Sequence, residues 1–130
     1  MEFWCISKQR GCKIKVLIID DNETITSALS KFLGFRKHDC TVVNDGRNGL
    51  QLIQNQKFDV VLLDLALPNF TGIDIINELE KVGKVKDQKI IILTASNPSN
   101  EQINDLLKKG VHSFQTKPLS VNTLVEVMSS

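Results

Sequence analysis

Three short runs of Val, Ile and Leu in this sequence lack any alternation of apolar and polar residues, and they constrain the fold more than any other feature. The runs lie at residues 16–19, 60–63 and 90–93. A strand with one face in water alternates, whereas an unbroken apolar run of this length is typical of a strand covered on both faces, as in a parallel sheet. The runs therefore predict central strands buried between two layers.

Segments with apolar residues at helical spacing separate these runs. In the first, Ile25, Leu29 and Leu33 recur on one face. Residues 40–43 and 112–117 are weaker candidates for two further strands. Local signals mark where the helices begin and end. The expected starts, in chain order, are one of Asp20, Asp21 and Asn22, then Asp45 with Gly46, the capping box of Thr71 and Asp74, Ser99 with Gln102, and Ser120. Gly110 is expected to end the helix that Ser99 begins.

Five strands that alternate with five helices predict right-handed crossovers and one parallel sheet between two helical layers. The fold class is therefore α/β, a doubly wound five-stranded parallel sheet. In such sheets, binding chemistry gathers in the crevice beyond the carboxyl ends of the strands.

Composition narrows the function classes. The chain has 130 residues, of which 42% are hydrophobic, which suits one domain with a substantial core. A net charge of +1 gives no electrostatic case for nucleic acid, and no apolar run approaches the roughly 20 residues that span a bilayer. The three cysteines have no metal-ligand spacing. We expect a cytoplasmic protein with an N-terminal extension at residues 1–12 and one domain at residues 13–130.

Polar residues stand where four of the predicted strands end. Asp20 and Asp21 follow the first strand, Asp64 the third, Thr94 the fourth and Lys117 the fifth. Because the carboxyl ends of parallel strands meet at one edge of a sheet, we expect these side chains to converge.

Their residue types make chemical sense together. Three close carboxylates repel one another and need a compensating cation, and Mg²⁺ takes oxygen ligands while it keeps sites for water or phosphate oxygens. Thr94 offers a hydroxyl and Lys117 a positive charge for a phosphoryl group. Asp64 can act as a nucleophile and form an aspartyl phosphate. Taken singly, Thr94 is also ordinary at a strand end and Lys117 in a solvated loop.

The ordered motifs IIDDN, VLLDLALPNFTG, ILTA and FQTKPL make the chain resemble a response-regulator receiver domain of two-component signalling, close to the single-domain chemotaxis receivers. The resemblance implies the flavodoxin-like strand order 2-1-3-4-5. It also implies that Asp20, Asp21, Asp64 and the backbone carbonyl of Ala66 bind Mg²⁺ or Mn²⁺, and that Asp64 is the phosphoacceptor.

The resemblance assigns further roles by position. Thr94 and Phe114 match the switch pair of the family, and Lys117 matches the lysine that contacts the phosphoryl group. A cis peptide is implied between Lys117 and Pro118, and Gly72 matches the turn glycine. Phe114 departs from the tyrosine of many relatives because it lacks a hydroxyl.

The implied function is a phosphoacceptor switch, not an enzyme beyond its own phosphorylation and dephosphorylation. The implied partners are a sensor histidine kinase or phosphotransfer protein and a downstream target protein, without nucleic acid or membrane. A homodimer that forms on phosphorylation is left open.

Three alternatives stand beside this hypothesis. The first is a receiver-fold module that binds partners without phosphorylation, and the second is a receiver fragment of a longer regulator. The third is a phosphatase of the haloacid-dehalogenase kind, which would require a second Asp two residues after its nucleophile. Asn22 and Ala66 occupy the two positions where that Asp would stand.

Overall fold

The computed structural model describes residues 14–94 and 98–117, which form a parallel sheet with helices on both faces. The elements of this part of the chain are β1 (Lys15–Ile19), α2 (Glu23–Phe35), β2 (Asp39–Val43), α3 (Gly46–Asn55), β3 (Val60–Asp64), α4 (Gly72–Lys81), a 3-10 turn (Val85–Asp87), β4 (Lys89–Thr94), α5 (Asn100–Lys109) and β5 (Ser113–Thr116). None of these helices is both long and apolar enough to cross a membrane.

The strands pair in the order β2-β1-β3-β4-β5, and all four pairings are parallel. The predicted fold class and strand order are therefore confirmed. The helix expected from Ser120, the extension at residues 1–12 and Pro118 lie outside the described residues, so these stay predictions.

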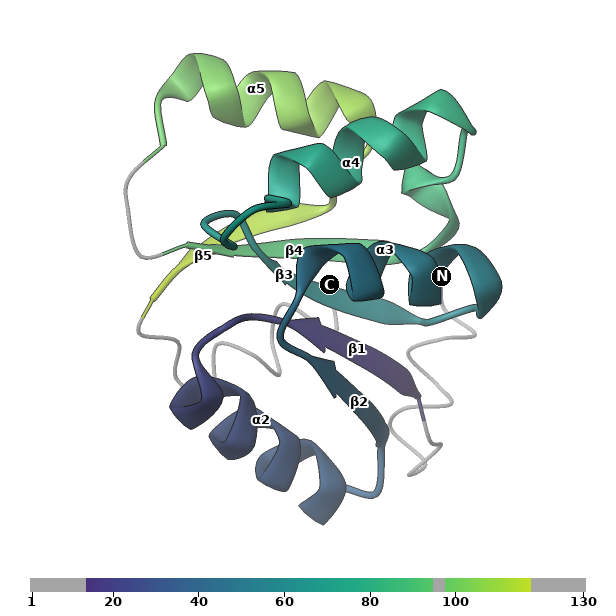
Figure 1. Cartoon of the computed structure of the whole chain (residues 1–130), viewed down its shortest axis with the longest axis vertical. Helices are drawn as coiled ribbons and strands as arrows, with labels where there is room; N and C mark the ends of the chain where they lie inside the picture. The colour runs from purple at the N-terminus through teal and green to yellow at the C-terminus, as the bar shows by residue number, and fades with distance from the viewer. Residues whose placement is uncertain (1–13, 95–97, 118–130) are drawn as a thin grey trace.

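The helices form two layers around the sheet. Figure 1 shows α3, α4 and α5 on one face and α2 on the other. β3 lies at the centre, and all five of its residues are buried, as the unbroken apolar run predicts. Alternate strand residues feed two separate cores: Ile19, for example, packs with the layer of α3 and α4, whereas Ile18 packs with that of α2.

Side-chain caps fix the points where the helices begin and end. Asn22 accepts hydrogen bonds from the first turn of α2, Thr71 and Asp74 form the predicted capping box of α4, and Ser99 caps α5. Gly110 ends α5 with a φ of 117°, in the left-handed region that favours glycine. Because α2 begins four residues after β1 ends, the intervening carboxylates stay at the edge of the sheet.

Candidate functional site

Asp20 lies at the end of β1 and is held at both its backbone and its carboxylate. Its N–H donates to the carbonyl of Val43 at 3.2 Å, and the side-chain amide of Asn44 donates to its carbonyl oxygen at 2.7 Å. The N–H of Asn22 donates to Oδ1 of Asp20 at 2.9 Å, which turns the chain into the cap of α2. Asp20 is only 1% exposed, whereas the adjacent Asp21 is exposed to solvent. β1 therefore presents one fixed and one solvated carboxylate.

Asp64 ends β3 and enters the site from the centre of the sheet. Its side chain is almost fully buried, and Oδ1 accepts a hydrogen bond from the N–H of Ala66 at 3.1 Å. The loop after it folds back tightly, because a Cβ at Gly72 would lie 2.6 Å from the carbonyl oxygen of Asp64. The absence of a side chain at Gly72 is therefore required for this close approach, which agrees with its position as the turn glycine.

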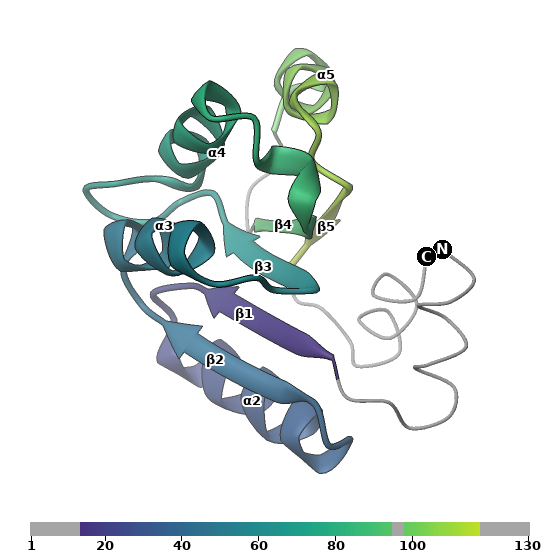
Figure 2. The ribbon, with the colours of Figure 1, turned by 90° about the vertical axis from the view of Figure 1, so that its right-hand side faces the viewer.

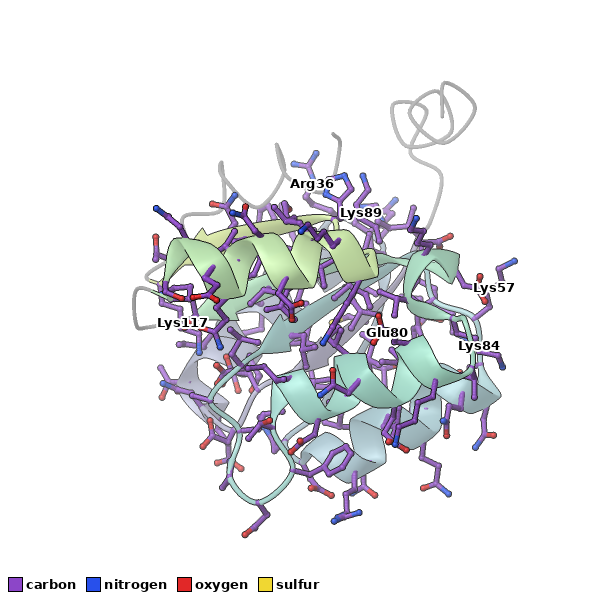
Figure 3. All side chains as sticks on the ribbon, turned by 90° about the horizontal axis from the view of Figure 1, so that it is seen from above. Arg36, Lys57, Glu80, Lys84, Lys89 and Lys117 are labelled. Carbon is purple, nitrogen blue, oxygen red and sulfur yellow. The ribbon has the colours of Figure 1, made fainter. Side chains whose placement is uncertain are left out.

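Lys117 connects the two buried carboxylates. Its Nζ donates to Oδ2 of Asp20 at 2.6 Å and lies 3.5 Å from Oδ2 of Asp64. Its backbone N–H donates to the carbonyl of Thr94 at 2.9 Å, which fixes the end of β5 against the end of β4. Figure 3 shows Lys117 at the opposite end of the molecule from Lys57 and Lys84. The ammonium group therefore belongs to the carboxyl edge of the sheet.

The three aspartates are close enough to bind one metal ion. One carboxylate oxygen from each of Asp20, Asp21 and Asp64 can be chosen so that all three lie within 4.8 Å of one another. A donor set made only of carboxylate oxygens suits a hard cation such as Mg²⁺, and it lacks the thiolate and imidazole ligands typical of zinc. The residues present therefore fit the metal that their sequence pattern implies.

The electrostatics of the site show why a cation would be favourable. Burial raises the pKa of Asp64, and the negative charge of Asp20 raises it further, against the opposing effects of the Ala66 N–H and the Lys117 charge. Burial by itself lowers the pKa of Lys117, but the hydrogen bond and charge of Asp20 and the charge of Asp64 together outweigh it and raise that pKa. One ammonium therefore offsets only part of the repulsion between two buried carboxylates.

The other predicted residues lie at or near this edge. Thr94 is 2% exposed at the end of β4, beside the backbone of Lys117. Ala66 is exposed in the loop after Asp64. Phe114 lies further back in β5, opposite Ile92, where it is half-buried against the core on the side of α3 and α4. The structure thus brings Asp20, Asp21, Asp64 and Lys117 into one cluster with Thr94 at its border, and places Phe114 outside it.

Sequence reasoning missed Asn44, which contacts Asp20, and Arg47, which contacts the loop after Asp64. Asn44 follows β2 as Asp20 follows β1, so the rule that selected the other strand ends also points to it. Arg47 lies at the start of α3, with its guanidinium 4.6 Å from the ring centroid of Phe70 in the loop after β3. No local sequence pattern links Arg47 to Phe70, because the two residues belong to different elements.

Comparisons with known proteins agree with this geometry. The family model described as "Response regulator receiver domain" matches residues 16–129. A curated relative, "Response regulator MprA" of Mycolicibacterium vanbaalenii, is 28% identical over 115 residues, which are 88% of this chain and 48% of that protein. The "Transcriptional regulatory protein DltR" of Streptococcus agalactiae is 28% identical over 86% of this chain and 49% of that protein. The chain spans about half the length of these curated relatives.

Solved structures give the same result. The receiver domain of the Francisella response regulator 1452 has a TM-score of 0.78 at 32% identity, over 88% of this chain and 93% of that one. The chemotaxis protein CheY4 of Vibrio cholerae has a TM-score of 0.79 at 26% identity, over 90% and 97%. A response regulator of Burkholderia pseudomallei, described with a phosphorylated aspartic acid, a calcium ion and citrate, has a TM-score of 0.75 at 26% identity, over 87% and 65%.

Proposed function

Because the chain belongs to the response-regulator receiver family, a family of signalling modules rather than true enzymes, we propose that it is a switch phosphorylated on Asp64 in a Mg²⁺-dependent reaction. A receiver implies a histidine kinase as its partner. The kinase, or a phosphotransfer protein, would supply the phosphoryl group from a phosphohistidine. The phosphorylated aspartic acid described in the Burkholderia regulator supports the choice of an aspartate as acceptor.

The chemistry follows from the positions of the side chains. A carboxylate oxygen of Asp64 attacks the phosphorus atom, a P–O bond forms, the P–N bond to the imidazole breaks, and the imidazole nitrogen leaves with the bonding pair and takes up a proton. Lys117 already lies 3.5 Å from Oδ2 of Asp64, so its ammonium can stabilise negative charge on the transferred group. A bound Mg²⁺ would supply further positive charge at the carboxylates of Asp20, Asp21 and Asp64.

The switch would use the residues at the edge of the site. A phosphoryl group adds negative charge beside the end of β4, which favours a shift of the Thr94 hydroxyl toward it. Phe114, which is half-buried in the neighbouring strand, would then change its packing and alter the surface near α5. A downstream target protein that binds one arrangement better would shift the equilibrium between the two.

One observation carries this proposal: Lys117 contacts two buried carboxylates that converge from separate strands, with a third carboxylate within metal-binding reach. A structural ion pair needs only one carboxylate, and a second buried carboxylate beside it is unfavourable unless a cation or a reaction uses it. This argues against the alternative of a module that binds partners without phosphorylation.

The test is the intact mass after incubation with Mg²⁺ and a small phosphodonor such as acetyl phosphate. We expect the mass of one phosphoryl group to be added to the wild type and to the control Asp87→Ala, which changes an exposed acid in the turn between α4 and β4. Asp64→Ala and an excess of chelator should each abolish the addition. An unmodified wild type, or a modified Asp64→Ala protein, would contradict the proposal.

A further inference from the structure

The loop from Leu65 to Thr71 connects β3 to α4 and carries Ala66, the proposed backbone ligand of the metal. Its conformation is irregular: Asn69 has a positive φ of 67°, and the N–H of Phe70 donates to the carbonyl of Pro68 at 2.7 Å. Ala66, Pro68 and Asn69 are exposed. Such a loop depends on contacts with neighbouring elements to keep one arrangement.

The start of α3 provides such a contact. Phe70 is half-buried and packs against the core, and its carbonyl oxygen lies where a Cβ at Gly46 would be only 2.1 Å away. The Arg47 guanidinium lies 4.6 Å from the Phe70 ring centroid, within the range of a cation–π interaction. Figure 2 shows the loop passing beside the N-terminal end of α3. Gly46 lets the loop approach α3, and Arg47 covers the approaching ring.

We propose that Arg47 is a positioning residue for the metal site: it holds Phe70 against α3 and thereby keeps the loop that carries Ala66 in its binding-competent arrangement. The inference rests on the proposed function, because it concerns affinity for Mg²⁺ at that site. If only a fraction of the molecules has the competent loop, the apparent Kd for the metal is the intrinsic Kd divided by that fraction. The stacking of Arg47 on Phe70 raises the fraction before the metal arrives.

The same chain offers a matched control. Arg36 lies 5.7 Å from the ring centroid of Phe32, so it makes the same kind of contact at the end of α2. That end of the helix leads into the first residue of β2, whereas the site lies beyond the carboxyl ends of the strands. An effect specific to the metal site should therefore follow Arg47 and not Arg36.

The experiment compares Arg47→Ala, Arg47→Lys and Arg36→Ala with the wild type in two measurements. Amide hydrogen exchange of Ala66 and Gly72 in metal-free protein reports on the loop without any metal. Calorimetric titration with Mg²⁺ gives the Kd. For Arg47→Ala we expect faster exchange and an increase in Kd of about two- to fivefold, which is the range that an exposed cation–π contact can supply. Arg47→Lys should recover part of the loss, and Arg36→Ala should change neither measurement.

A double mutant separates stacking from a general charge effect. In a Phe70→Leu background, Arg47→Ala should cause little further increase in Kd, because the ring that it covers is already absent. Unchanged exchange and Kd in Arg47→Ala, or an equal effect of Arg36→Ala, overturn the role of Arg47. A wild type that binds no Mg²⁺ overturns the proposed metal site itself. A wild type that binds Mg²⁺ with a Kd that Arg47→Ala leaves unchanged overturns the role of Arg47 alone.

Discussion

At the scale of single residues, Asp20 and Asp64 have different positions in the same cluster. Asp20 accepts hydrogen bonds from the Lys117 ammonium and from the N–H of Asn22, so both of its oxygens are satisfied. Asp64 accepts one backbone hydrogen bond and lies 3.5 Å from Lys117. Burial and the nearby charge of Asp20 raise the pKa of Asp64, so this environment disfavours the ionised form of Asp64.

Asp64→Asn should stabilise the metal-free protein at neutral pH. The amide keeps an oxygen for the N–H of Ala66 and removes a buried charge, so we expect a rise in Tm on the order of a few degrees. Thermal unfolding in the presence of a chelator measures it. Asp87→Asn, which removes an exposed charge, should leave Tm nearly unchanged. A lower Tm for Asp64→Asn would mean that its ionised form is stabilised by contacts with the protein.

The pH dependence gives a second test of the same group. Because its pKa is raised in the folded state, Asp64 binds its proton more tightly there than in the unfolded chain. Its contribution to stability is then greatest at low pH and is lost as pH rises from about 3.8 through the folded pKa. The difference in Tm between Asp64→Asn and the wild type should grow over that interval and be constant above it. A difference that shrinks with rising pH would contradict the raised pKa.

Substitution by alanine should have opposite effects on the free energy of unfolding at Gly72 and at Gly34. A Cβ at Gly72 would meet backbone atoms of Asp64 and Leu65 at 2.6 and 2.9 Å, so Gly72→Ala should destabilise the fold by about 1–3 kcal/mol. Gly34 lies in α2 with nothing within 4 Å of such an atom, so Gly34→Ala should stabilise it by up to about 1 kcal/mol. Denaturant unfolding checks both. Equal effects would show that the tight turn after β3 can relax.

At the scale of secondary-structure elements, α5 is the described helix with the fewest residues buried in the core. Leu106 is its one buried residue, whereas α4 buries four. A polar contact adds to this support: Nζ of Lys109 donates to Oδ1 of Asn77 on α4 at 2.7 Å and lies 3.2 Å from Asp105. Because few of its residues are buried, α5 is a reasonable location for the surface that the proposed switch would change.

Lys109→Met should therefore loosen α5 selectively. Loss of a hydrogen bond worth about 1 kcal/mol predicts exchange of the α5 amides that is about fivefold faster, with little change in β3. Lys108→Met is the matched control, since Lys108 is adjacent and exposed. Equal protection of α5 in both variants would show that the bond to Asn77 does not hold the helix.

The elements and most of their ends could be predicted because their signals are local. The caps at Asn22, Thr71 and Ser99 and the end at Gly110 depend on residues within one turn of one another. The contacts between different elements could not be predicted in this way. Asn44 reaches Asp20 across 24 positions and Lys109 reaches Asn77 across 32, and which side chains meet depends on how the elements pack.

At the scale of the whole molecule, the rule for parallel sheets indicated which strand-end residues would gather, because strand direction fixes the edge at which each strand ends. It did not indicate how the charges would be divided. That Lys117 would bond to Asp20 at 2.6 Å and stand 3.5 Å from Asp64 depends on side-chain conformations that a strand pattern does not specify.

Mg²⁺ should stabilise the whole domain through this site. A ligand at ten times its Kd adds about 1.4 kcal/mol to the free energy of unfolding, a rise in Tm on the order of 5 °C for a chain of this size. Asp21→Asn should reduce the rise without lowering the metal-free Tm, because Asp21 is exposed. NaCl at matched ionic strength is the control. An equal rise with NaCl would indicate general screening instead of binding.

The burial of Asp64 has a consequence for anyone who selects heat-resistant variants of this protein. The sheet brings the carboxylates together during folding, so their repulsion weakens the fold before any ligand is present. Selection in metal-free buffer would favour neutral residues at Asp64, and the most heat-resistant variants would be those that had lost the proposed phosphoacceptor. A selection that retains function must therefore include the cation or screen for phosphorylation directly.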